Sequence, residues 1–183
     1  MKTSGRIAAT ALVILVMGTG TALAAAPGIS SDNEAERSAI THVLDDEGAA
    51  WLAGDADAFA AHVLPNISFA NTVGMFSIGK EAFVAQHRAI FSTIYKGSKA
   101  QQFVVAMTFL KPDVAIVDTV AKVSGARQMP TGVPAIDGVL YTRLEQVMVK
   151  QSGTWWVAAF HNVPIQPQFV TDEVRAVASG TPH

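Results

Sequence analysis

The main change in the spacing of apolar residues lies between Gly97, where the last long helical pattern ends, and Gln102, and no other feature constrains the fold as strongly. Before Gly97, apolar residues recur every three or four positions, as on one face of a helix, from Ile40 to Trp51 and again from Phe83 to Ile94. After Gly97, turn residues divide a β-rich stretch into expected strands at residues 103–110, 114–124, 139–151 and 155–163. This order predicts an α+β domain in which a curved antiparallel sheet wraps around about three helices.

A pocket is expected at one end of this sheet. A short helix capped by Asp55 and a strand at residues 67–72 precede the sheet's main strands, and a weak helix near Asp172 follows them. A curved sheet around a long helix cannot fill its own interior completely. Pockets of this kind bind small apolar molecules, which we expect as the ligand.

The first 24 residues have the pattern of a secretory signal peptide. Lys2 and Arg6 precede an apolar run from Ile7 to Val16, and the small-residue sequence Ala22-Leu23-Ala24 follows it. The run is shorter than the roughly 20 residues that a membrane-spanning helix needs. We therefore expect a signal peptide at residues 1–24, a linker at 25–33, a cavity domain at 34–164 and a C-terminal tail at 165–183. The mature protein should be periplasmic or secreted, with no stable membrane anchor.

The composition excludes several classes of protein. The chain is 50% hydrophobic and 15% charged, which is too apolar for a disordered protein. It has no cysteine, so disulfides, thiolate metal sites and cysteine nucleophiles are excluded. Its net charge is -2, and its Lys and Arg residues form no basic stripe, so we expect no nucleic-acid partner.

Three stretches resemble a known superfamily. They are Trp-Leu-Ala-Gly-Asp-Ala-Asp-Ala-Phe at residues 51–59, Leu-Lys-Pro-Asp-Val-Ala at 110–115 and Gly-Thr-Trp-Trp-Val-Ala-Ala-Phe-His-Asn at 153–162. Together they resemble the SnoaL-like branch of the nuclear transport factor 2-like superfamily, and within it the SgcJ/EcaC-type group. The resemblance covers residues 34 to about 164.

This resemblance implies a cone-shaped α+β barrel, a central cavity and frequent homodimers. The superfamily includes isomerases, dehydratases, epoxide hydrolases, cyclases and noncatalytic assembly domains, so the fold does not determine the function. Relatives often carry an acid where Asn66 stands and a Thr or Ser where Val163 stands. We therefore assign no role to these two side chains.

His87 is the first candidate catalytic residue. It shares a helical face with Phe83 and Phe91, which places it on the buried side of its helix. In a ligand pocket a buried imidazole can serve as acid, base or hydrogen-bond donor. The alternative is a core histidine that is simply paired.

Asp118 is the second candidate catalytic residue. It shares a strand face with Ile116 and Val120. If that face is interior, burial raises the pKa of the Asp118 carboxyl and suits it to act as a general base. The alternative is that Asp118 faces solvent or pairs with Arg143.

The last hairpin supplies most of the candidate binding residues. A two-residue Ser152-Gly153 turn puts Arg143 opposite Asn162, whereas a three-residue loop puts Arg143 opposite His161. Because strand side chains alternate, either His161 or Asn162 points inward, and an end-of-strand cap or a dimer contact is the alternative role. The expected binding residues are Phe69, Asn71, Tyr141, Arg143, Gln146, His161 and Asn162.

No sequence pattern indicates a metal or a cofactor. The chain lacks a His-Glu-x-x-His pair, a Gly-rich dinucleotide fingerprint and a Gly-x-Ser-x-Gly nucleophile elbow. The charged run Asp45-Asp46-Glu47 is interpreted as a solvated helix face.

Two functions are open at this point. One is a cofactor-free acid–base enzyme of the isomerase, dehydratase or cyclase type, with His87 or Asp118 as the base. The other is a noncatalytic dimeric module that captures a ligand in the same cavity or a protein partner on the outer sheet face.

Overall fold

The computed structural model describes residues 31–180, and its elements follow the expected order. The helices are α1 (Ser31–Ala53), α2 (Ala56–Phe59), α3 (Lys80–Ser92) and α4 (Asp172–Val177), with a 3₁₀ turn, η1 (Pro167–Phe169). The strands are β1 (Val63–Ala70), β2 (Phe76–Ile78), β3 (Lys99–Lys111), β4 (Val114–Ser124), β5 (Leu140–Gln151) and β6 (Thr154–Pro164). The expected signal peptide at residues 1–24 lies outside the described residues, as does most of the linker. Within the described range, no helix is both long enough and apolar enough to cross a membrane.

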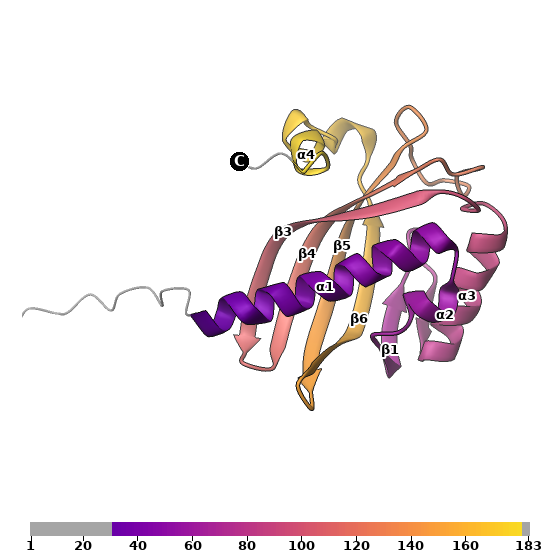
Figure 1. Cartoon of the computed structure of the whole chain (residues 1–183). Coiled ribbons are helices and arrows are strands. Elements are labelled where there is room, and N and C mark those ends of the chain that lie inside the picture. Colours follow the sequence, from indigo (N-terminus) through magenta and orange to yellow (C-terminus); the bar gives the residue numbers. More distant parts are fainter. Residues whose placement is uncertain (1–30, 181–183) are drawn as a thin grey trace, which may run out of the picture. The chain divides into compact units, whose positions relative to one another are not determined.

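The six strands form one sheet in the order β2-β1-β6-β5-β4-β3, and α1 runs along one face of it (Figure 1). Neighbouring strands are antiparallel except β1 and β6, which are parallel. The expected curved sheet is therefore present, and this pair is the one exception to antiparallel pairing among the described strands. Tight turns dictate antiparallel pairing in the hairpins β3–β4 and β5–β6, but no turn joins β1 to β6, so nothing local sets their relative direction.

The main core lies on the face of the sheet that packs against α1, α2 and α3, here called the inner face. Leu144 and Met148 of β5 point to this face, because side chains alternate along a strand. Ile40 and Leu44 of α1 and Phe83 of α3 pack in the same cluster, each at most 5% exposed. Burying each such side chain stabilises the fold by roughly 1.5–3 kcal/mol.

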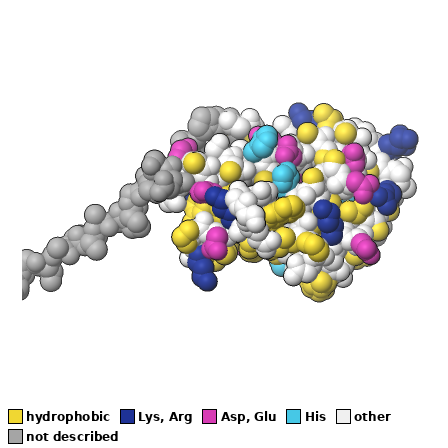
Figure 2. Space-filling view, turned by 60° about the horizontal axis from the view of Figure 1, so that its bottom comes forward, with side chains coloured by type: hydrophobic (Ala, Val, Ile, Leu, Met, Phe, Trp, Pro, Cys, Tyr) yellow, Lys and Arg dark blue, Asp and Glu magenta, His cyan; other side chains and the backbone are white. Residues whose placement is uncertain are grey.

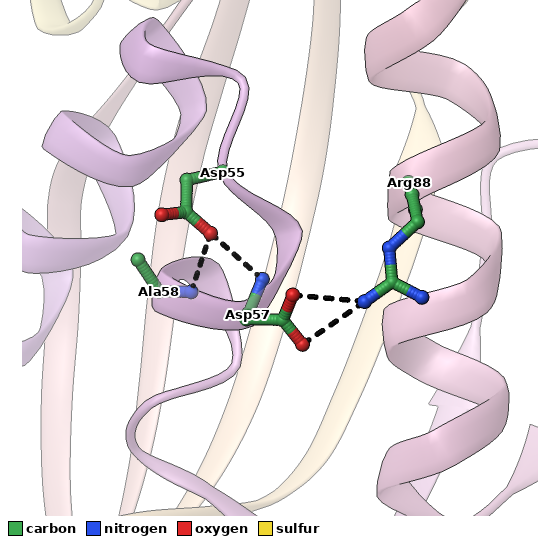
Figure 3. Close-up of polar contacts among 4 residues, drawn as sticks. All are labelled: Asp55, Asp57, Ala58 and Arg88. Carbon is green, nitrogen blue, oxygen red and sulfur yellow. Dashed lines mark hydrogen bonds and ion pairs between the residues drawn. The ribbon is translucent and has the colours of Figure 1, made fainter.

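The short helix α2 is held by two local interactions (Figure 3). The Asp55 side chain accepts hydrogen bonds from the backbone N–H groups of Asp57 and Ala58, each at 3.0 Å, which confirms the expected cap. Asp57 in turn accepts two hydrogen bonds from Arg88 of α3, at 3.1 and 2.8 Å. Both charged side chains are largely exposed, so this ion pair orients α2 on α3 but adds at most about 1 kcal/mol.

The outer face of the sheet, opposite α1, is partly covered by the C-terminal residues. Val170 and Val174, beside and within α4, pack against Val120 and Tyr141 of the sheet. The Thr171 hydroxyl caps α4 by accepting from the Val174 N–H at 3.3 Å. Residue 164 therefore marks the end of the sheet, but the following residues up to 180 are part of the folded domain and not a free tail.

A bulge in β6 decides which side chains of the last hairpin point inward. The two-residue Ser152-Gly153 turn is present, with positive φ angles of 50° and 84°. The pairing set by this turn continues as far as Val157 opposite Met148. The next pair is Ala159 opposite Val147, so Ala158 has no partner on β5 and is the extra residue of the bulge. Neither expected pairing occurs as a result.

Beyond this bulge, Arg143 lies opposite Val163, not opposite Asn162 or His161. Asn162 pairs with Leu144, whose side chain is in the inner core, and His161 pairs with Glu145 on the outer face. Asn162 is therefore the member of the pair that points inward.

Candidate functional site

A cavity of about 250 Å³ lies between α3 and the inner face of the sheet. The expected hollow is therefore present, and its walls are mostly apolar, with contributions from the ring or chain carbons of Ile90, Ile94, Leu140 and Phe160. Of the expected site residues, the cavity is lined by Phe69, Asn71, His87 and Asn162. It is large enough for a small ring compound, since a dry apolar cavity of about 150 Å³ already binds benzene.

His87 reaches the cavity from α3 through a cage of aromatic rings. It is 3% exposed, and its ring centroid lies 4.6 Å from that of Phe59, 5.4 Å from that of Phe69 and 4.2 Å from that of Phe83. Its Nδ1 lies 2.8 Å from the backbone oxygen of Phe83. A carbonyl oxygen can only accept, so Nδ1 carries the proton and Nε2 carries a lone pair.

Burial lowers the pKa of His87 from 6.5 to about 4, although the bond to Phe83 opposes this effect. The imidazole is thus neutral at physiological pH. Within residues 31–180, Nε2 has no hydrogen-bond partner, so it offers an acceptor to a ligand.

Three further polar groups of the cavity wall are Thr142, Asn162 and Tyr95. Among the described residues, Thr142 Oγ1 and Asn162 Oδ1 are buried and lack a hydrogen-bond partner. Burial also raises the pKa of Tyr95 to about 12, so its hydroxyl stays protonated. Asn71 is different, because its Oδ1 already accepts from the N–H groups of Val73 and Met75 at 3.1 and 2.9 Å and so shapes the turn at the cavity mouth.

A second, smaller pocket of about 40 Å³ adjoins the cavity, and we call it the inner pocket. Four residues line both spaces, namely Trp51, Val123, Phe160 and Asn162. The inner pocket also contains Glu47 of α1, which is 2% exposed. A buried carboxyl group therefore lies next to the cavity.

Two glutamines from the sheet hold Glu47. Gln102 of β3 donates to Oε2 at 2.7 Å, and Gln146 of β5 donates to Oε1 at 3.0 Å and to Oε2 at 2.9 Å. Burial raises the pKa of Glu47 from 4.5 to about 7, because desolvation of the carboxylate outweighs these hydrogen bonds. Glu47 therefore changes its protonation state near neutral pH.

The interpretation of Asp45-Asp46-Glu47 as a solvated face is wrong for Glu47. Asp45 is exposed, but Glu47 follows Leu44 by three residues and precedes Trp51 by four, so it lies on the apolar stripe of α1. The helical spacing that identified this stripe could have found Glu47. The charged run concealed it, because runs of acidic residues are usually exposed.

Asp118 is not a residue of the cavity. The inner positions of β4 are the odd-numbered ones, among them Ala115 and Val117, so Asp118 faces the outer side of the sheet. Asp118 was expected to act as a base only if its face of the strand was interior. That face is the outer one, so the role is not supported. Its neighbour on β5 is Glu145, not the expected Arg143.

Three other expected binding residues also lie on the outer face. Tyr141 is buried beneath α4, with the Arg175 guanidinium 6.0 Å from its ring centroid. Arg143 is exposed to solvent. His161 lies on the outer face with its Nε2 3.1 Å from the Ser68 hydroxyl oxygen. Along β5 and β6 these residues alternate with residues of the inner face. A shift of one residue in the strand register would move them to the inner face, beside the cavity.

Comparisons with known proteins identify the fold. No family model and no curated protein matches the chain. An uncharacterized protein with a cystatin-like fold from Caulobacter vibrioides is 25% identical, covers 72% of this chain and 91% of its own, and has a TM-score of 0.62. A putative scytalone dehydratase from Novosphingobium aromaticivorans is 18% identical over 74% of this chain and 87% of its own, with a TM-score of 0.63.

A nuclear transport factor 2-like protein of unknown function from Shewanella oneidensis is 14% identical over 70% of this chain and 98% of its own, with a TM-score of 0.58. The chain has the nuclear transport factor 2-like, or cystatin-like, fold. This agrees with the superfamily that the sequence resembles and with the expected α+β class.

Proposed function

We propose that this protein binds a small, largely apolar molecule in the cavity between α3 and the inner face of the sheet. One observation carries the proposal: an apolar cavity whose wall contains unpaired polar atoms, namely His87 Nε2, Thr142 Oγ1 and Asn162 Oδ1 among the described residues. A buried polar atom without a partner costs about 1–3 kcal/mol. A ligand that pairs with these atoms while filling the apolar space recovers part of that cost.

Blocking the cavity tests this proposal. Ile94→Trp adds a large side chain to the cavity wall, whereas Leu52→Trp makes the same kind of change at a residue of α1 that is 61% exposed and does not line the cavity. Titration with p-xylene, followed by NMR chemical shifts, should show saturable binding by the wild type and Leu52→Trp but not by Ile94→Trp. Equal binding by both variants would place the ligand elsewhere and refute the proposal.

We further propose a cofactor-free acid–base enzyme of the isomerase, dehydratase or cyclase type, in the SnoaL-like branch. The free lone pair of His87 Nε2 favours it, as does the likeness to a structure described as a putative scytalone dehydratase. His87 would accept a proton next to a carbonyl group while Thr142 or Tyr95 donates to the carbonyl oxygen. Deuterium exchange into cyclohexanone, compared between the wild type and His87→Leu, tests this role. Full exchange by the variant would remove it.

Export and self-association are part of the same proposal. Residues 1–24 have the pattern of a cleaved leader, and the protein should be periplasmic or secreted. The outer face also carries apolar surface for a homodimer, including Val163, which is 61% exposed. Cell fractionation with N-terminal sequencing tests the first expectation, and light scattering of the purified protein tests the second. Figure 2 shows both charge signs interspersed on one face, which gives no support to a nucleic-acid partner.

A further inference from the structure

The inner pocket adjoins the cavity. Trp51, Val123, Phe160 and Asn162 line both spaces, so the two spaces lie on opposite sides of the same side chains. At about 40 Å³, the inner pocket is close to the roughly 30 Å³ that one water molecule occupies in the liquid. One polar group of about that size can therefore enter it.

The fully buried atoms without a partner around the inner pocket are acceptors, and the Asn162 amide adds N–H donors that have no partner among the described residues. A carboxylate has about four acceptor positions, and Glu47 uses three of them for its glutamine hydrogen bonds. Gln102 Oε1 and Asn162 Oδ1 are buried and have no partner among the described residues. The amide N–H of Gln102 is already directed at Glu47, and the indole N–H of Trp51 donates to Ser98 Oγ at 2.9 Å.

We propose that the inner pocket is a subsite for a hydroxyl group, which donates its proton to Glu47 or Asn162 while the apolar body of the same ligand fills the main cavity. This subsite rests on the proposed function, because it requires a ligand in the cavity. The ligand class it defines is a small phenol or alcohol with a compact apolar body.

The chemistry of the pocket favours a hydroxyl over the other common head groups. A carboxylate or phosphate would be repelled by Glu47 and would offer no proton to the acceptors. A methyl group would leave the acceptors unpaired, at the full cost of their burial. A protonated amine would lose its hydration shell in a space too small to keep any of its water.

The proton and the hydroxyl compete for the same carboxylate. The groups that face Glu47 from the other elements are Gln102, Gln146, Asn162, Phe59 and Phe160, and Trp51 lies one turn further along α1. None of them titrates, and His87 lies beyond the rings of Trp51 and Phe59, which it contacts. Protonation of Glu47, whose pKa is about 7, therefore weakens hydroxyl binding as the pH falls, and leaves binding of a purely apolar ligand unchanged.

The test compares p-cresol with p-xylene, which carries a methyl in place of the hydroxyl. Dissociation constants are measured by NMR titration at pH 5.5 and 8.5, where p-cresol stays neutral because a phenol has a pKa of about 10. The proteins are the wild type, Glu47→Gln and the control Asp45→Asn, which removes a carboxylate from an exposed position of the same helix.

We expect the wild type and Asp45→Asn to bind p-cresol about tenfold more tightly than p-xylene at pH 8.5, a preference that disappears at pH 5.5. In Glu47→Gln the preference should fall by about tenfold at pH 8.5 and no longer depend on pH. If that variant does not fold, the wild-type pH series decides the matter, and a preference independent of pH overturns the subsite.

Two results distinguish the failure of the subsite from the failure of the cavity. If p-xylene binds and p-cresol binds equally or more weakly at pH 8.5, the subsite is wrong and the apolar cavity stands. If neither compound binds the wild type, both proposals are wrong.

Discussion

Replacing Glu47 with glutamine should change how the free energy of unfolding depends on pH. Burial holds the pKa of Glu47 at about 7, up from 4.5, and that of His87 at about 4, down from 6.5. Between pH 4.5 and 6.5 the folded protein keeps a proton on Glu47 that the unfolded chain has released. In the same range it lacks a proton on His87 that the unfolded chain has bound.

These two effects have opposite signs and similar sizes. The stability associated with Glu47 is fully present below pH 4.5 and is lost as the pH rises to about 7. The stability associated with His87 is fully present above pH 6.5 and is lost as the pH falls to about 4. Each amounts to about 3 kcal/mol over its range. Together the two groups should leave the wild-type stability nearly flat between pH 4.5 and 6.5.

Glu47→Gln removes one effect and leaves the other. The free energy of unfolding of the variant, relative to the wild type, should be about 3 kcal/mol higher at pH 8 than at pH 4.5. Urea unfolding followed by tryptophan fluorescence at half-unit steps of pH measures this difference, with Asp45→Asn as the control. A difference between Glu47→Gln and wild type that stays constant across this range would refute the account of Glu47 as a buried group that titrates near neutral pH.

Three further predictions concern the fold. Deleting Ala158 removes the extra residue but keeps Val157 opposite Met148 and Ala159 opposite Val147, so Phe160 should stay on the inner face and p-xylene should still bind; loss of p-xylene binding by the folded variant would show that Ala158 is needed to place Phe160. Val174→Asp places a charge beneath α4 and should speed tryptic cleavage at Arg175 by about tenfold; an unchanged rate would mean that α4 is not held by this contact. Phe83→Ala should cost about 3–5 kcal/mol in urea unfolding, because Phe83 is fully buried, and a loss below about 1 kcal/mol would contradict its place in the core.

The sequence predicted the elements well because their signals are local. Helical spacing located α1 and α3, and β-branched runs between turn residues located the four long strands. The faces of those strands were harder to predict. A single extra residue, Ala158, reverses which side chains of β6 point inward, and no turn or glycine marks it in the sequence.

The candidate site could be predicted in part for the same reason. His87 was identified correctly because the apolar face of its helix repeats over several turns, so an error at one position does not change which face is buried. Asp118 and Tyr141 were assigned to the cavity, but both lie on the outer face of the sheet. Strand side chains alternate between the two faces, so an error of one residue reverses the assignment. Glu47 was missed although its helical spacing placed it on the apolar stripe, since its charge suggested exposure.

A crystal structure of the protein with p-cresol tests the central claim most directly. The ring should lie between His87 and Phe160, with the hydroxyl directed at Asn162 and Glu47. A ring bound only on the outer face, or a cavity closed by the side chains around it, would contradict the account.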